Sequence, residues 1–148
     1  MAASAKARLV GQDGVLRTLP GLADVTVEYD MPATVPREVV YGGDFAGAVA
    51  LAAFKGSAPS RILRQGDIAL QLHVRVSAPG QTTREATDTR AAEIATVIEE
   101  YVAGNPTLDD LSGLKLAEVQ AVESGGWIDD DGATSTLTIQ IGLKSVVR

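Results

Sequence analysis

The chain offers few residues for histidine or cysteine chemistry. His73 is the only histidine, and the sequence contains no cysteine. We therefore expect no histidine pair for zinc, no thiolate metal site, no serine triad and no disulfide framework. Apolar and polar residues alternate around His73, which places it on the outer face of a strand and predicts a surface residue.

Carboxylates occur in two short runs. Asp129-Asp130-Asp131-Gly132 lacks the spaced acidic pattern and the final glutamate of a calcium-binding loop, so we interpret it as the turn of a β-hairpin. Glu99 and Glu100 fall on the polar face of a predicted helix, where paired carboxylates usually serve solubility and not acid–base catalysis. Neither run predicts a catalytic or metal site.

The glycines and the single tryptophan give no sign of a nucleotide site. Neither of the glycine-rich phosphate-binding motifs occurs in the sequence. We interpret Gly42-Gly43 and Gly125-Gly126 as turn residues at the ends of strands. Trp127, beside a predicted turn, is either an exposed anchor or a residue packed against its own sheet. The sequence thus predicts no enzyme, no cofactor and no bound metal.

Two elements have strong periodicity. Residues 68–76 alternate apolar and polar side chains, which predicts a half-buried strand. Residues 81–102 repeat apolar side chains at helical spacing and predict a long helix, which ends near Gly104-Asn105-Pro106. Thr82 or Thr83 is a candidate N-cap for this helix, and an acid three residues after Thr82 matches a capping box.

The first half of the chain is predicted to form shorter helices, strands and loops. Residues 4–19 suggest a short helix weakened by two glycines, and residues 24–29 and 37–41 suggest two strands paired like a hairpin. Residues 45–54 fit a short helix or a buried strand, and we favour the strand. Residues 55–66 are rich in glycine, serine and proline, which predicts an exposed, flexible loop.

The last third predicts a long hairpin. Residues 114–122 and 135–147 alternate, and the segments Gly125–Trp127 and Asp129–Gly132 between them are expected to form the turn. The order of elements predicts an α+β fold, with a mostly antiparallel mixed sheet packed by one long and one short helix on one face. A chain of 148 residues is expected to form a single domain, 1–148.

Composition excludes several classes of protein. Apolar residues make up 45% of the chain, too many for a disordered acidic tail. The uncharged apolar run at 45–54 has ten residues, whereas a membrane-spanning helix needs about 20. Lys6 and Arg8 are not followed by the apolar core of a secretion signal, so we expect the protein to stay where it is made.

Charge is distributed unevenly along the chain. The formal net charge is −6, yet residues 55–90 hold six basic and three acidic side chains, and residues 91–140 hold ten acidic and one basic. An overall basic footprint for nucleic acid is missing, whereas segments of opposite sign favour self-association. The alternative is that these are solvated charges on separate faces. Ser135 to Val147, expected to be a long edge strand, is a further candidate for pairing between subunits.

The order of these segments resembles a known family. Leu19-Pro20-Gly21-Leu22 ends the first helix, Asp24 to Tyr29 follows, and Pro36 to Asp44 comes next. A strong strand from Leu70 to Val76, the helix from Arg84 to Val102 and the closing hairpin around Trp127 complete the series. Along nearly the whole chain this arrangement resembles the tail terminator (minor tail, tail-completion) proteins of long-tailed siphophages, particularly those of actinobacterial hosts.

The resemblance implies an α+β structural protein of the virion. Such a protein forms a ring of six copies at the head-proximal end of the tail tube, stops tube polymerisation and offers its other face to head-completion or neck proteins. DNA passes through the lumen without specific recognition, and the ring is assembled in the host cytoplasm. The alternatives are another head–tail connector, a tail tube protein, or a soluble monomeric binding module.

Charge and the resemblance together indicate which residues contact other subunits or the tube. The flexible basic segment near 55–66 would meet an acidic neighbour, which is either the acidic C-terminal half of an adjacent subunit or the rim of the tube. The candidate interface residues are Lys55, Arg61, Arg64, Trp127, Asp129, Asp130 and Asp131.

Overall fold

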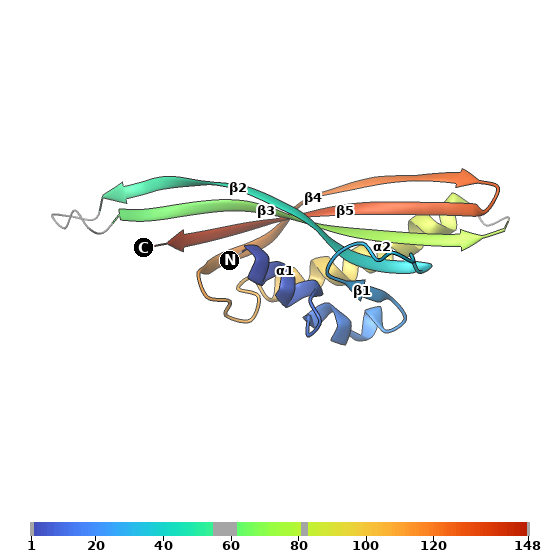
Figure 1. Cartoon of the computed structure of the whole chain (residues 1–148), viewed down its shortest axis with the longest axis horizontal. Coiled ribbons are helices and arrows are strands. Elements are labelled where there is room, and N and C mark those ends of the chain that lie inside the picture. The colour runs from blue at the N-terminus through green and yellow to red at the C-terminus, as the bar shows by residue number, and fades with distance from the viewer. Residues whose placement is uncertain (1, 55–61, 81–82, 148) are drawn as a thin grey trace.

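A computed structural model describes residues 2–54, 62–80 and 83–147, with the backbone alone for 48–54, 62–66 and 146–147. In chain order the elements are α1 (Ala2–Val10), two 3-10 turns (Val15–Thr18 and Pro20–Leu22), β1 (Thr26–Glu28), β2 (Glu38–Phe54), β3 (Ile62–Pro79), α2 (Arg84–Gly104), β4 (Leu114–Asp129) and β5 (Gly132–Val147). One five-stranded mixed sheet carries one long and one short helix, so the predicted α+β class is confirmed (Figure 1).

The strands lie in the order β1-β2-β3-β5-β4. β1 runs parallel to β2, with Thr26 opposite Val39, and every other pair is antiparallel. The hairpin expected from residues 24–29 and 37–41 is therefore wrong. Residues 29–37 bring the chain back to the starting end of the sheet, whereas a hairpin would reverse it in a tight turn.

Two long antiparallel hairpins form most of the sheet. β2 pairs with β3 from Glu38 to Phe54, which confirms the strand favoured for residues 45–54. The loop expected over 55–66 is shorter, because Ile62 to Gly66 pair with β2 and so belong to β3. Residues 55–61 lie outside the described residues. The two hairpins join along β3 and β5, from Arg64 opposite Val147 to Pro79 opposite Gly132.

The helices lie on one side of the sheet, as predicted (Figure 1). The stripe of Ile94, Ile98 and Val102 on α2 is fully buried, and so are Leu72 of β3 and Ile139 of β5 in the same cluster. Burying a side chain of this size contributes roughly 1.5–3 kcal/mol, so this layer is the main source of stability. The helix begins at Arg84, and the backbone of Thr83 caps it without a side-chain hydrogen bond. Thr82, the alternative cap, lies outside the described residues.

The N-terminal helix is shorter than expected. It ends at Val10, and the segment after Gly11 and Gly14 forms a separate 3-10 turn, because glycine disfavours the helix interior. Lys6 is 95% buried beneath the sheet, where its ammonium lies 2.7 Å from Asp30 and 3.9 Å from the centre of the Tyr29 ring. This buried cation ties α1 to the segment that follows β1.

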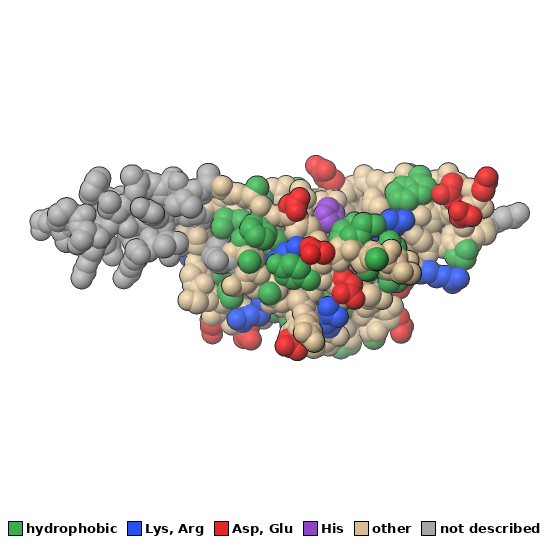
Figure 2. All heavy atoms as spheres, viewed as in Figure 1, with side chains coloured by type: hydrophobic (Ala, Val, Ile, Leu, Met, Phe, Trp, Pro, Cys, Tyr) green, Lys and Arg blue, Asp and Glu red, His purple; other side chains and the backbone are tan. Residues whose placement is uncertain are grey.

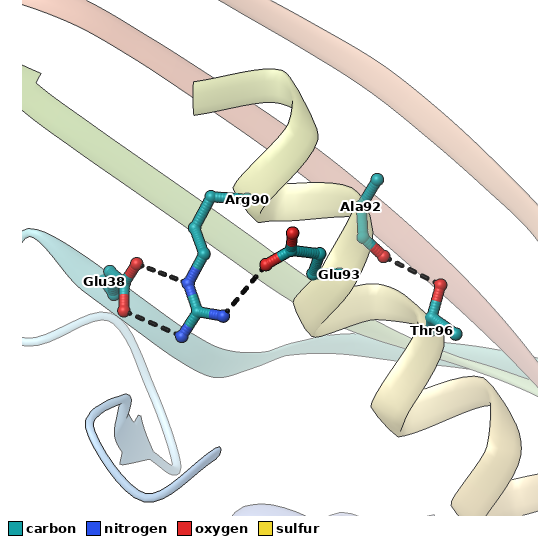
Figure 3. A network of polar contacts seen from close by, with 5 residues as sticks. All are labelled: Glu38, Arg90, Ala92, Glu93 and Thr96. Atoms are coloured by element: carbon teal, nitrogen blue, oxygen red, sulfur yellow. Dashed lines mark hydrogen bonds and ion pairs between the residues drawn. The ribbon is translucent and has the colours of Figure 1, made fainter. Parts of the chain in front are cut away.

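An ion-pair network attaches α2 to the start of β2 (Figure 3). Arg90 donates hydrogen bonds to both carboxylate oxygens of Glu38, and a third to Glu93 on its own helix at 3.2 Å. The hydrogen bonds to Glu38 are the main cause that raises the pKa of Arg90 above its ordinary value. The network holds the edge of the sheet against the helix layer.

Candidate functional site

Of the candidate interface residues, Arg64 and the acidic turn at Asp129–Asp131 lie toward opposite ends of an elongated sheet (Figure 1). The paired ends of β2 and β3, at Phe54 and Ile62, mark one end, and the turn between β4 and β5 marks the other. β3 connects these ends, and its residues from Arg64 to Pro79 span about 50 Å at the usual rise of a strand. One subunit therefore does not bring its own acidic turn to Arg64.

The acidic turn is a tight hairpin, as predicted. Asp129 pairs with Gly132, and the carboxylate of Asp129 accepts a hydrogen bond from the backbone N–H of Asp131 at 2.9 Å. Gly132 has a φ of +132°, and a Cβ there would meet the carbonyl oxygen of Ala78 at 2.0 Å. Asp129, Asp130 and Asp131 are all exposed. In Figure 2 acidic side chains gather at this end of the molecule.

The basic segment is described only in part. Lys55 and Arg61 lie outside the described residues. Arg64 is part of β3, where its backbone pairs with Leu51 on β2 and Val147 on β5. The position of Arg64 places the described end of the segment at the tip of the β2–β3 hairpin.

Trp127 lies on the face of the sheet away from the helices. It pairs with Thr134 on β5, and 44% of its surface is exposed. The guanidinium carbon of Arg75 lies 5.2 Å from the centre of its ring, a cation–π contact. Trp127 thus contacts its own sheet through Arg75, and nearly half of its surface remains exposed.

The Gly125-Gly126 pair is not a turn, as the sequence suggested, but part of β4. Gly126 has a φ of +153°, and a Cβ there would meet the carbonyl oxygen of Thr134 at 2.3 Å and the guanidinium of Arg84 at 3.1 Å. The strand therefore needs glycine here, because the backbone of Thr134 leaves no space for a Cβ and φ is positive. The hairpin turn lies three residues later, where Asp129 and Gly132 pair.

His73 also lies on the outer face, as predicted, but it is half-buried there. Its Nδ1 lies 3.1 Å from the hydroxyl of Thr138, and its ring centre is 5.0 Å from that of Tyr41. Burial lowers the pKa of His73 below its ordinary value, and the nearby charge of Asp44 raises it in part. His73 is therefore a neutral member of a packed outer face near neutral pH.

The exposed edge of the sheet is β4 and not the strand expected from the sequence. Ser135 to Val147 belong to β5, which lies between β3 and β4 and is paired on both sides. A groove of about 580 Å³ runs between the edge of β4 and the second half of α2. The groove is lined by Val102, Leu116 and Val122. Glu99 also lines it and is half-buried, so of the two glutamates expected on the polar face of the helix only Glu100 is exposed.

Within the described part of the chain, no group of three or more histidine, aspartate or glutamate side chains is arranged to hold a metal ion. No helix among the described residues is long and apolar enough to cross a membrane.

Two arginines near Trp127 were not among the candidate site residues predicted from the sequence. Arg37 and Arg75 line a pocket of about 370 Å³ together with Trp127, Asp129 and Asp131. Alternation placed Arg75 on the outer face, but the pattern of one strand does not reveal the strand beside it. The signal that would have found the pocket is the register, which brings β2, β3, β5 and β4 side by side.

Comparisons with known proteins show a likeness in fold and none in sequence family. No protein-family model matches the chain, and no curated protein sequence matches it. Among solved structures, the fold is similar to that of a chain from the "virion of native gene transfer agent (GTA) particle", with a TM-score of 0.54 and 14% sequence identity. The match covers 98% of this chain and 94% of that chain. At this identity the likeness shows a shared fold over the full length of both chains.

Proposed function

We propose that this chain is a structural protein of a virion, with no enzymatic role. In this proposal it forms a ring at the head-proximal end of a long, non-contractile phage tail tube. The ring ends tube polymerisation and provides the surface for head joining. Its partners are other copies of the chain, six in the closed ring, the tail tube protein and a head-completion or neck protein, while DNA passes through the lumen. It acts at the head–tail junction after assembly in the host cytoplasm.

The observation that supports a virion role most directly is the likeness to the gene transfer agent chain. It extends over 98% of this chain and 94% of that one, so it includes both long hairpins and both helices. The order of segments in the sequence independently resembles the tail terminator family. A virion role is the interpretation that these two observations share.

The opposite ends of the sheet support the ring. A head-to-tail interface needs two different surfaces on one chain, and it closes into a ring when its rotation divides a full turn. The acidic turn at Asp129–Asp131 and the segment that carries Lys55, Arg61 and Arg64 have opposite charge. Because Arg64 and the acidic turn lie toward opposite ends of the sheet, the acidic turn of one subunit would meet the basic segment of another subunit and not its own.

A charge exchange between two variants tests this arrangement. The first variant carries Arg61→Glu and Arg64→Glu, and the second carries Asp129→Lys, Asp130→Lys and Asp131→Lys. Alone, each places like charges at every interface and should lose ring formation, measured by light scattering. Mixed, the two should alternate around an even-numbered ring and recover it. The defects and the rescue should both be larger at low salt, where charges are least screened.

Glu100→Lys, on the exposed face of α2, is the control for charge reversal away from both ends and should leave assembly unchanged. Each variant is also checked for unaltered thermal unfolding. Variants that assemble normally alone, or a mixture that fails to recover, would contradict the head-to-tail contact.

The terminator role needs a second experiment. Electron micrographs of the purified chain with a tail tube protein should show tubes of limited length with a ring at one end. A continuous ladder of stacked rings formed by the chain alone would instead identify a tube protein. A chain that remains monomeric with and without the tube protein would favour a binding module.

A further inference from the structure

We propose that the pocket between Arg37, Arg75 and Trp127 binds a carboxylate side chain presented by a partner protein. This pocket, called here the arginine–tryptophan pocket, lies on the outer face of the sheet near the β4–β5 turn. It has a volume of about 370 Å³, and its lining also includes Ser77, Thr134, Asp129 and Asp131. The inference does not depend on the ring proposed above.

The strand register builds the pocket from four neighbouring strands. The backbone N–H of Ser77 donates to the carbonyl oxygen of Arg37 at 2.7 Å, which places Arg37 beside Ser77. Ser77 in turn lies opposite Thr134, and Thr134 lies opposite Trp127. Arg75 is two positions before Ser77 on β3, so its side chain emerges on the same face. Arg75 therefore projects from a paired strand, and Arg37, which directly precedes β2, is held near it by the backbone hydrogen bond from Ser77.

Arg75 is held in place but lacks an acceptor. Its guanidinium lies over the Trp127 ring, and its Nε is buried without a hydrogen-bond partner among the described residues. Arg37 and Arg75 form no ion pair in the described part of the chain. By contrast, Arg17 and Arg90 each face a carboxylate, and Arg8 donates to two carbonyl oxygens. The Nε of Arg84 is also buried without a partner, but the same guanidinium pairs with Asp88. A buried, unpaired donor is costly, so an incoming acceptor is favoured.

The floor of the pocket adds a hydroxyl donor. The hydroxyl oxygens of Ser77 and Thr134 lie 3.2 Å apart, within hydrogen-bond distance. When one hydroxyl donates to the other, the second keeps its own hydrogen free to donate. A carboxylate in the pocket would thus meet guanidinium groups and a hydroxyl donor. Arginine's planar fork suits a carboxylate with two oxygens.

The acidic residues beside the pocket favour a protein partner over nucleic acid. Asp129 and Asp131 form part of its lining, and Asp130 lies exposed in the same turn. A polyanion would bring several phosphates close to these carboxylates, and their repulsion would oppose binding. A single aspartate or glutamate on a partner chain brings only one negative charge to the arginines, so it meets less of this repulsion. The geometry therefore fits one carboxylate from a protein.

The chain carries its own reporter for this binding, because Trp127 is its only tryptophan. Its fluorescence is titrated with a capped tripeptide, alanyl-glutamyl-alanine, and with the matched peptide that has glutamine in the middle. The glutamate peptide should give a saturable change that the glutamine peptide does not give. Arg75→Gln and Arg37→Gln should each weaken binding about tenfold, as expected for a charged hydrogen bond.

Two further variants separate the pocket from general charge effects. Lys115→Gln removes an exposed positive charge at the other end of β4 and should leave binding unchanged. Asp131→Asn should strengthen binding of the glutamate peptide, because it removes a repelling carboxylate. Circular dichroism checks that each variant is folded, and Arg37→Gln, at an exposed position, serves if Arg75→Gln unfolds.

Several results would overturn the inference. These are equal responses to the glutamate and glutamine peptides, unchanged affinity in both arginine variants, or equal loss in Lys115→Gln. Binding of a short single-stranded oligonucleotide that depends on Arg37 and Arg75 and exceeds that of the peptide would identify a nucleic-acid site instead. The titration is carried out with the chain at low concentration and does not require a ring. A failure to form rings would therefore not affect the result of the titration.

Discussion

Arg90 on α2 donates two hydrogen bonds, 2.6 and 3.1 Å long, to the two carboxylate oxygens of Glu38 at the start of β2. The two residues are 52 positions apart in the chain, so this contact links the helix layer to the early part of the sheet. Both side chains retain some exposure, 33% for Arg90 and 24% for Glu38, and water weakens the attraction between them.

The Arg90–Glu38 pair should make a modest contribution to stability. In a double-mutant cycle with Arg90→Gln and Glu38→Gln, we expect a coupling energy of about 0.5–1 kcal/mol, above that of most exposed pairs because both oxygens are bonded. Chemical unfolding of the four proteins measures it. The pair Arg84 and Asp88, with one contact at 3.5 Å, is the comparison and should couple more weakly. Equal coupling in the two pairs would contradict the importance of the two-oxygen geometry.

The core of α2 should be far more sensitive than its surface. Ile98 is fully buried against the sheet, so Ile98→Ala should lower the free energy of unfolding by roughly 2–5 kcal/mol. Glu100 on the same helix is exposed, and Glu100→Ala should change it by less than about 0.5 kcal/mol. Urea unfolding of both variants provides the measurement, and similar costs would show that the buried face of α2 is assigned wrongly.

His73 should make stability depend on pH in a defined window. Because burial lowers its pKa in the folded chain, the unfolded chain takes up the proton at higher pH. The stability contributed by neutral His73 is fully present above pH 6.5, the ordinary pKa of histidine. This stability is lost as the pH falls from 6.5 toward the lower pKa of His73 in the folded chain. Unfolding of the wild type and of His73→Gln, compared across this window, should show a steeper loss in the wild type. Parallel curves would argue against the burial effect.

The two glycines of β4 should differ in their tolerance of alanine. Gly126 has a positive φ and its Cβ would meet the backbone of Thr134, so Gly126→Ala should destabilise the fold by roughly 1–3 kcal/mol or more. A Cβ at Gly125 would meet only the hydroxyl oxygen of Thr136, at 3.1 Å, a contact that a small shift can relieve. Gly125→Ala is thus the matched control. Thermal unfolding distinguishes them, and a larger effect at Gly125 would contradict the backbone geometry of β4.

Elements with one clear period were predictable from the sequence. The stripe of α2 and the alternation of residues 68–76 each reflect a single buried face, and the structure has the expected helix and strand there. The parallel pairing of β1 with β2 was not predictable, because it depends on the path of residues 29–37 and not on the strands themselves. The length of the hairpins was also missed, since Gly125-Gly126 looks like a turn, whereas both residues lie within β4 and Gly126 lies close to the backbone of Thr134.

The candidate sites show a similar division. The turn at Asp129–Gly132 follows from local residue types, and it forms as predicted. The pocket around Arg75 and Trp127 depends on which strands are neighbours, since β5 comes between the strands that carry these two residues. Alternation along one strand contains no information about that order. The interface role of Lys55, Arg61, Arg64, Trp127 and the three aspartates stays a prediction.

The pairing of β3 with β5, called here the seam, joins the two hairpins and affects how the chain folds. Within each hairpin, the strands that pair are neighbours in sequence, so each can form early and locally. Partners across the seam are 53 to 83 positions apart, and closing such loops before any contact forms is slow. Substitutions of buried seam residues such as Leu72 or Ile139 should therefore slow refolding if the two halves meet in the transition state. Substitutions at the hairpin tips should mainly speed unfolding.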